Sequence, residues 1–235
     1  MRLTLADHLE ELRRRLAICV LAVVAGSGLG FALAPRLLAW LKQPAGSWLP
    51  ALAVLSPTEA LAAYVRVAVT FGLIVALPVV LHQVWVFIES ALTRSERFYG
   101  VLFVWLGSLL FAGGAMFAYA VVLPVSLRVL LSLGGPSLVP VISVSRYLSF
   151  TLGLMTVCGA VCELPLVIVL LARMGLVTPK GLRQRRGLAL VIILAVAALL
   201  TPTTDALNLL LMAIPLVVLY ELSVFLARLA RPAIR

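Results

Sequence analysis

Histidine and cysteine are scarce in this chain, with two and three copies among 235 residues. The three cysteines, Cys19, Cys158 and Cys162, lie in apolar segments, and their spacing fits neither a disulfide framework nor a metal site. No glycine-rich phosphate-binding loop is present, and the two histidines form no pairing with a nucleophile and no metal-ligand cluster. These absences argue against an enzyme and against a metal or organic cofactor.

Charged residues are also few, at 12% of the chain, whereas a typical soluble domain has about 25%. The chain is instead 63% hydrophobic, with a mean hydropathy of +1.17. Several charge-free runs reach the length of about 20 residues that crosses a bilayer as a helix. The sequence therefore predicts an all-α integral membrane protein with a single six-helix transmembrane domain over residues 1–235. The six expected spans are Leu16–Ala34, Val67–Ile88, Tyr99–Leu123, Tyr147–Ala172, Gly187–Leu200 and Ala206–Ala227.

The fifth and sixth spans are expected to form a hairpin, because only the short segment "TPTTD" separates them. The fifth span reaches only about 21 Å at about 1.5 Å per residue, against a hydrocarbon core of about 30 Å. Such a short helix requires a thinner bilayer or cover from neighbouring protein at its ends.

Six spans place both termini on the same side of the membrane. With this assignment, 14 of the 19 lysines and arginines lie on the side of the termini and 5 on the other. Because basic residues accumulate in cytoplasmic loops, we expect both termini to be cytoplasmic. The net charge of +10 then reflects topology, and no fold motif supports nucleic-acid binding.

Two long loops on the outer side are mostly apolar and are expected to form a cap over the bundle. In "SPTEAL", Ser56 is the expected N-cap, Pro57 the first helical residue and Glu59 the partner in a capping box. Ser56→Ala is then expected to cost about 1 kcal/mol of local helix stability. The second loop, from Pro124 to Arg146, contains a turn at "GGP".

The inner side begins with "LADHLEELRRRLAICV", which predicts a helix at the membrane surface. Glu10 and Arg14, like Glu11 and Arg15, have the i,i+4 spacing of helical ion pairs. One interpretation is a surface helix stabilised by its own ion pairs. The other is an acidic site for a basic ligand near the membrane surface.

Glu163 is the most unusual acidic residue, because its nearest charged neighbours in the sequence are Arg146 and Arg173. A carboxylate that faces lipid near mid-bilayer costs roughly 2.5 kcal/mol or more. Glu163 is therefore expected to face protein or a hydrated groove. It could be protonated and hydrogen-bonded between helices, or it could offer a polar contact within the membrane. Glu221 lies near the inner end of the last span, where it could reach the interface or pair with Arg228.

Seven segments occur in a defined order along nearly the whole chain: "HLEELRRRL", "SPTEAL", "ALPVVLHQVWVFIESAL…ER", "FAYAVVLP", "CELPLVIVLLARMGLVT", "LLTPTTD" and "AIPLVVLYE". Together they closely resemble the TatC family, the polytopic component of the twin-arginine protein translocase. The resemblance implies a multi-pass plasma-membrane receptor for signal peptides that carry paired arginines on folded cargo. It also implies an oligomeric receptor complex with single-span TatA-like and TatB-like subunits, driven by the proton-motive force.

The resemblance assigns roles to particular residues by position. Glu11 in "HLEEL" and Glu96 in "SER" match the carboxylates that bind the arginine pair, and Glu163 in "CELP" matches the intramembrane glutamate expected to contact a partner. Asp205 and Pro215 match positions of the outer hairpin and the last span, as Ser56, Pro57 and Glu59 match the cap.

Two other classes of protein remain possible from the residues alone. A proton-coupled small-molecule transporter would use Glu163 as a proton relay, but no pairing of the first three spans with the last three is visible, although many such folds have two related halves. A six-helix scaffold would leave Glu163 without a role. Binding of a twin-arginine peptide, rather than of a small solute, would distinguish the receptor from the transporter.

Overall fold

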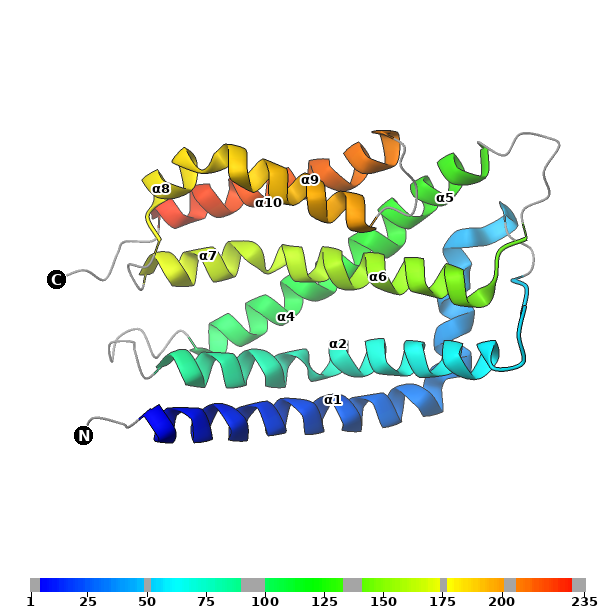
Figure 1. Ribbon diagram of the computed structural model, residues 1–235, viewed down its shortest axis with the longest axis horizontal. Helices are drawn as coiled ribbons and strands as arrows, with labels where there is room; N and C mark the ends of the chain where they lie inside the picture. Colours follow the sequence, from blue (N-terminus) through cyan, green and yellow to red (C-terminus); the bar gives the residue numbers. More distant parts are fainter. Residues whose placement is uncertain are drawn as a thin grey trace. The chain divides into compact units, whose positions relative to one another are not determined.

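The structure, a computed structural model, describes residues 5–48, 52–89, 100–132, 141–173, 177–200 and 206–229, and these residues are almost entirely helical (Figure 1). The all-α prediction is confirmed. The elements are α1 (Leu5–Lys42), the 3-10 helix η1 (Gln43–Trp48), α2 (Glu59–Glu89), α4 (Gly100–Phe117), the π-helix η2 (Ala118–Val122), α5 (Leu123–Ser132), α6 (Val144–Cys162), α7 (Leu164–Arg173), α8 (Pro179–Gln184), α9 (Arg186–Leu200) and α10 (Ala206–Leu229).

Among the described residues, four stretches of helix are long and apolar enough to cross a membrane: Leu9–Gly46, Glu59–Ile88, Gly100–Ser132 and Val144–Ala172. The last two expected spans correspond to shorter apolar helices within α9 and α10. Large apolar side chains point outward, as Trp105 at 72% and Leu109 at 71% exposure illustrate. A soluble protein rarely leaves so much apolar surface exposed, so these faces are suited to lipid.

The chain forms two compact units, which we describe separately. Unit 1 consists of Met1–Leu38 and Tyr64–Leu109, and unit 2 consists of Ala39–Ala63 and Leu110–Arg235. Unit 1 thus holds most of α1 and α2 with the first half of α4. Unit 2 holds the segment between α1 and α2 and everything after the middle of α4. That the whole chain is a single domain stays a prediction.

In unit 1, α1 and α2 lie side by side because small residues let their backbones approach (Figure 1). A Cβ atom placed on Gly26 would lie 2.9 Å from the carbonyl oxygen of Gly72, and one on Gly30 would lie 2.7 Å from that of Ala68. Van der Waals contact between small residues is a main source of helix association in lipid, where burial of apolar area adds little. Glycine at these positions therefore determines how closely the helix pair packs.

Gly26→Leu is expected to destabilise unit 1 by about 1–3 kcal/mol, because the new side chain would meet backbone atoms that cannot move aside locally. Gly28→Leu is the matched control, since a Cβ atom there has no atom within 4 Å and Gly28 is exposed. Thermal unfolding of the purified protein in detergent measures both effects. Equal unfolding midpoints for the two variants would contradict this packing.

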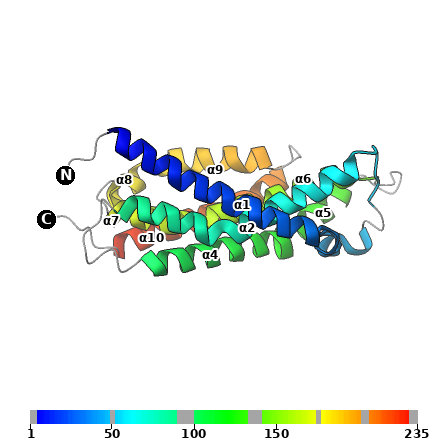
Figure 2. The same ribbon diagram turned by 90° about the horizontal axis from the view of Figure 1, so that it is seen from below.

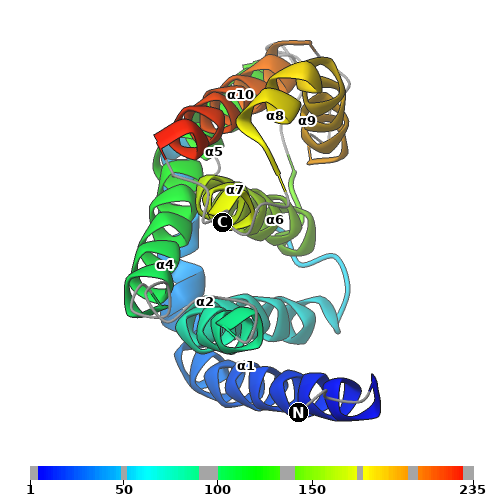
Figure 3. The ribbon, with the colours of Figure 1, turned by 90° about the vertical axis from the view of Figure 1, so that its left-hand side faces the viewer.

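In unit 2, α10 packs along α7 and α9, and the hairpin of α9 and α10 is visible end-on in Figure 3. The part of α4 in this unit packs against α6 through another glycine. A Cβ atom placed on Gly114 would lie 2.6 Å from the carbonyl oxygen of Cys158. The short helix α8 and the helix α5 lie at opposite ends of unit 2 (Figure 2).

Two helices extend beyond the bounds that the sequence predicted. The first span was expected to end before Pro35, but α1 continues through this proline to Lys42. Pro35 removes only one backbone N–H, and the apolar residues that follow can continue the helix, with Leu41 buried at 3% exposure.

The second outer loop was expected to begin at Pro124, but Leu123–Ser132 forms α5. Proline is tolerated in the first turn of a helix. Because Pro124 has no N–H to donate to Ala120, the preceding turns have the wider π-helical form of η2. Leu123, Ser126 and Leu127 lie three or four residues apart and form the buried face of α5.

The fourth span is interrupted at Glu163, where α6 ends and α7 begins. Pro165 cannot donate a hydrogen bond to Val161, which is its partner four residues earlier. The carbonyl oxygen of Glu163 instead accepts from the N–H groups of Leu166 and Val167, both at 3.0 Å. The only intramembrane glutamate of this span therefore lies at a break in its helix.

Candidate functional site

The two long loops meet in unit 2 at residues 39–48, 52–58 and 141–145, which we call the cap. The N–H of Ala53 donates to Ile142 and the N–H of Val144 donates to Ala53, both at 3.0 Å, in a short parallel bridge. The end of α1 is also bound to α6, because the side-chain hydroxyl of Tyr147 donates to the carbonyl oxygen of Leu41 at 2.7 Å. The two loops therefore contact one another, and that they cover the outer end of the bundle stays a prediction.

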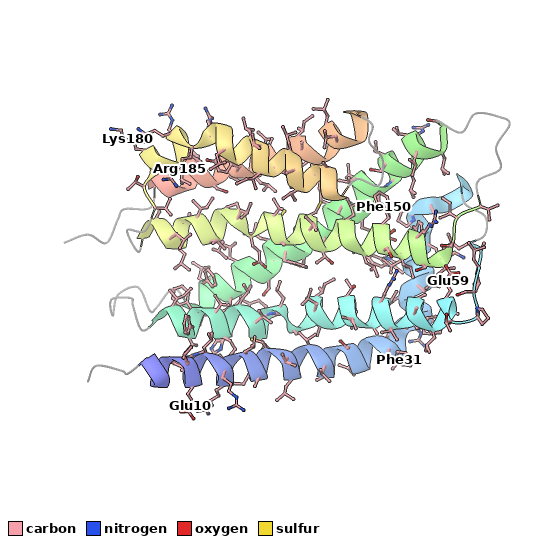
Figure 4. All side chains as sticks on the ribbon, in the orientation of Figure 1. Glu10, Phe31, Glu59, Phe150, Lys180 and Arg185 are labelled. Carbon is pink, nitrogen blue, oxygen red and sulfur yellow. The ribbon has the colours of Figure 1, made fainter. Side chains whose placement is uncertain are left out.

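Glu59, which is labelled in Figure 4, connects the two loops of the cap, because both of its carboxylate oxygens accept backbone hydrogen bonds. Its Oε2 accepts from the N–H of Leu55 at 2.6 Å, and its Oε1 accepts from the N–H of Ser145 at 2.8 Å. Glu59 is 93% buried, with a relative exposure of 7%. Two backbone donors stabilise the ionised carboxylate, so the charge is compensated without a basic partner.

The start of α2 differs from the expected capping box. The helix begins at Glu59 rather than at Pro57, and the carbonyl oxygen of Thr58 accepts from the N–H of Ala62 at 3.0 Å. Ser56 lies in the turn before the helix, where its carbonyl oxygen accepts from the N–H of Glu59 at 3.1 Å and its side chain is exposed. Proline lacks the N–H that a strand or helix partner would need, so Pro57 suits this turn.

Glu59→Gln is expected to lower the thermal midpoint of the protein by more than Ser56→Ala does. The amide would turn an NH₂ group toward one of the two backbone N–H donors and leave that donor without an acceptor. Ser56→Ala changes an exposed position and is expected to stay within about 0.5 kcal/mol of the wild type. Thermal unfolding and proteolysis of the cap measure these effects, and a larger loss from Ser56→Ala would show that the serine side chain caps the helix after all.

A polar pocket of about 240 Å³ lies in unit 1 between α1 and α2. Its lining residues are Glu11, Arg14, Arg15, Ile18 and Gln83. Glu11 forms an ion pair with Arg15 one turn later in α1, as the i,i+4 spacing predicted. Gln83 from α2 lines the same pocket.

Glu10 does not line this pocket, although Arg14, one turn later on the same face of α1, does. It is exposed and points away from α2 in Figure 4. Successive helical residues are about 100° apart around the axis, so the two neighbouring glutamates face different surroundings. Glu96, the expected partner of Glu11 in arginine binding, lies outside the described residues, and their proximity stays a prediction.

Glu163 is half-buried in unit 2, and its Oε1 is buried without a hydrogen-bond partner among the described residues. It is therefore neither fully exposed to lipid nor satisfied in a packed core. Native structures leave few buried polar atoms unsatisfied, and each of them calls for an explanation. A groove beside Glu163 stays a prediction.

The end of unit 2 around α8 contains an ion pair that the sequence analysis assigned differently. Glu221 accepts from Nε of Arg186 at 2.5 Å and from its Nη2, in a two-point contact between α10 and the start of α9. The sequence analysis did not name Arg186 as a partner. The side chain of Arg228 lies outside the described residues, so its pairing with Glu221 stays a prediction. Pro215 lies inside α10 and is partly exposed, and Asp205 lies outside the described residues.

Three contacts came only from the structure, because their partners are distant in sequence: Gln83 near Glu11, Ser145 on Glu59 and Arg186 on Glu221. The segment "HQVWVF" contained Gln83, but no local pattern indicates which helix it faces. Within the described ranges, no group of three or more His, Cys, Asp or Glu side chains could hold a metal ion.

These features define a polytopic helical membrane protein. Its described polar groups include the pocket lining at Glu11, Glu59 in the cap and Glu163 at a helix break. Comparison with known proteins narrows this class, because the sequence pattern of the Sec-independent protein translocase protein (TatC) family matches residues 7–215. The chain belongs to the TatC family.

The similarity extends over the whole length of related proteins. The chain is 42% identical over 233 residues to the Sec-independent protein translocase protein TatC of Aquifex aeolicus, covering 96% of this chain and 95% of that protein. The TatC protein of Carboxydothermus hydrogenoformans is 35% identical over 230 residues, with 98% and 95% covered. A crystal structure of the twin-arginine translocase receptor TatC superimposes with a TM-score of 0.86 at 40% identity, covering 95% of this chain and 99% of that one.

Proposed function

We propose that this protein is the membrane receptor and core component of a twin-arginine translocase. It binds the twin-arginine signal peptides of folded cargo and docks single-span TatA-like and TatB-like subunits. It acts in the plasma membrane with both termini in the cytoplasm, and it has no catalytic role of its own. The observation that supports this proposal most is the pocket at Glu11, since it combines a family-matched carboxylate with space for a basic ligand.

The charges around the pocket explain why recognition requires two carboxylates. The described lining has two arginines and one glutamate, and Arg15 already pairs with Glu11. Two incoming guanidinium groups would add two positive charges to a lining that is already basic. Glu96 supplies the second carboxylate on this proposal. Because an arginine can bind a carboxylate through two parallel hydrogen bonds, whereas lysine is a point charge, the site selects arginine over lysine.

The cap has a separate role on this proposal, because it lies in unit 2 and the arginine site lies in unit 1 on different residues. It helps to hold the hydrophobic part of the signal peptide and the partner subunits on the outer side. Glu59→Gln is therefore expected to reduce transport while the binding of the arginine pair persists. If Glu59→Gln abolished binding of the twin-arginine signal peptide while the cap stayed intact, the two sites would not have separate roles.

Binding of a synthetic signal peptide to the purified full-length protein tests the proposal directly. A photoreactive group beside the paired arginines should crosslink to residues around Glu11 and to the loop that contains Glu96. The same peptide with two lysines is the matched control and should crosslink much less. Equal crosslinking of both peptides, or labelling confined to other segments, would contradict the proposed receptor site.

A further inference from the structure

Three exposed basic residues lie on α8 and directly after it. Lys180, Arg183 and Arg185 are all exposed, and Figure 4 shows Lys180 and Arg185 at the α8 end of unit 2. We call these three residues the α8 patch. The patch belongs to unit 2, so it is distinct from the pocket at Glu11.

The α8 patch lacks acidic neighbours in the part of unit 2 that the structure describes. Glu59 lies in the cap, and the ten residues of α7 separate Glu163 from the start of the α8 region. Glu221 lies at this end, but it binds Arg186 through both oxygens. Within this described part of unit 2, no acidic side chain is shown to pair with the three cations.

The backbone that carries the patch is held in place by several contacts. The side chain of Thr178 caps α8 by accepting from the N–H of Gly181 at 3.1 Å. The hydroxyl of Tyr220 in α10 donates to the carbonyl oxygen of Leu182 at 2.9 Å. An anchored backbone presents its cations with a smaller entropic cost on binding than a free loop would.

The patch continues directly into an apolar surface. The carbonyl oxygen of Arg185 accepts from the N–H of Ala189 at 3.0 Å, so the helical path continues from α8 into α9. Within about two turns of Arg185, α9 exposes Leu188 at 59%, Val191 at 63% and Ile192 at 53%. The basic residues are therefore followed by exposed apolar residues on the next helix.

We propose that the α8 patch binds the headgroup of an anionic phospholipid, whose acyl chains lie along the exposed face of α9. A soluble acidic segment would match the charges but would leave the apolar face of α9 unused. A lipid matches both, because its phosphate and its chains are joined in the same order as the cations and the apolar residues. The lipid also covers the side of α9, whose 15 residues are about 22 Å long and shorter than the hydrocarbon core.

Native mass spectrometry of the full-length protein in detergent tests this inference with two lipids of equal chain length. The protein is expected to bind phosphatidylglycerol about tenfold or more tightly than phosphatidylcholine, because each basic side chain near an anionic headgroup adds to the attraction. The triple variant K180Q/R183Q/R185Q should lose this preference. The variant R36Q/K42Q/R146Q removes the same residue types from the opposite expected surface and should keep it.

Raising the salt concentration provides a second measure that needs no variant. The preference of the wild type for phosphatidylglycerol should fall as salt screens the exposed charges. The inference would be overturned by an unchanged preference in K180Q/R183Q/R185Q or by an equal loss in the control variant. Displacement of the lipid by millimolar inorganic phosphate would indicate a free-anion site, and binding of an acidic peptide without any lipid preference would indicate a protein partner.

Discussion

Glu11→Gln and Glu96→Gln are each expected to weaken binding of a twin-arginine signal peptide by about tenfold or more. A hydrogen bond to a charged group contributes about 1.5–3 kcal/mol, and about 1.4 kcal/mol is a tenfold change in affinity. Glutamine keeps the size of the side chain but loses the charge and one acceptor oxygen. Fluorescence titration of the purified protein with a labelled signal peptide measures the effect.

Glu10→Gln is the matched control for this experiment. Glu10 precedes Glu11 in the same helix turn, but it is exposed, points away from α2 in Figure 4 and does not line the pocket. Its replacement should leave peptide affinity within about twofold, because it changes an exposed charge in water. Wild-type affinity in both Glu11→Gln and Glu96→Gln, with unchanged thermal midpoints, would remove these two residues from the recognition site.

Glu163→Ala is expected to reduce cargo transport by about tenfold or more while signal-peptide binding stays unchanged. The physical reason is the buried Oε1, which has no acceptor or donor partner in the described part of the chain. A single-span subunit with a polar residue would satisfy that atom, and leaving a polar group unpaired costs about 1–3 kcal/mol. Transport into inverted membrane vesicles and co-purification of the TatA-like and TatB-like subunits measure the two effects.

Glu163→Gln is the conservative comparison, because the amide keeps hydrogen-bonding capacity, and it should impair transport less than alanine does. A structural role can be separated from docking by thermal unfolding. If Glu163 serves docking, neither variant should lower the midpoint, since the isolated chain gives Oε1 no partner to lose. A large drop in midpoint with intact co-purification would assign Glu163 to the fold of unit 2.

Much of this protein follows from local patterns in its sequence. Apolar runs of about 20 residues must become helices in a bilayer, because only a helix satisfies its own backbone hydrogen bonds there. The ion pair of Glu11 and Arg15 follows from their spacing in one helix. The position of Pro165 likewise places a helix break beside Glu163.

Tertiary structure determined which distant residues meet. Glu59 reaches the N–H of Ser145 across 86 positions, and Glu221 binds Arg186 across 35 positions, although a capping box and a local partner were the expected contacts. The continuation of α1 beyond Pro35 also depends on packing, since Leu41 is buried in unit 2. Local spacing determines which side chains share a helix face, but a long-range contact depends on which faces meet when the helices pack.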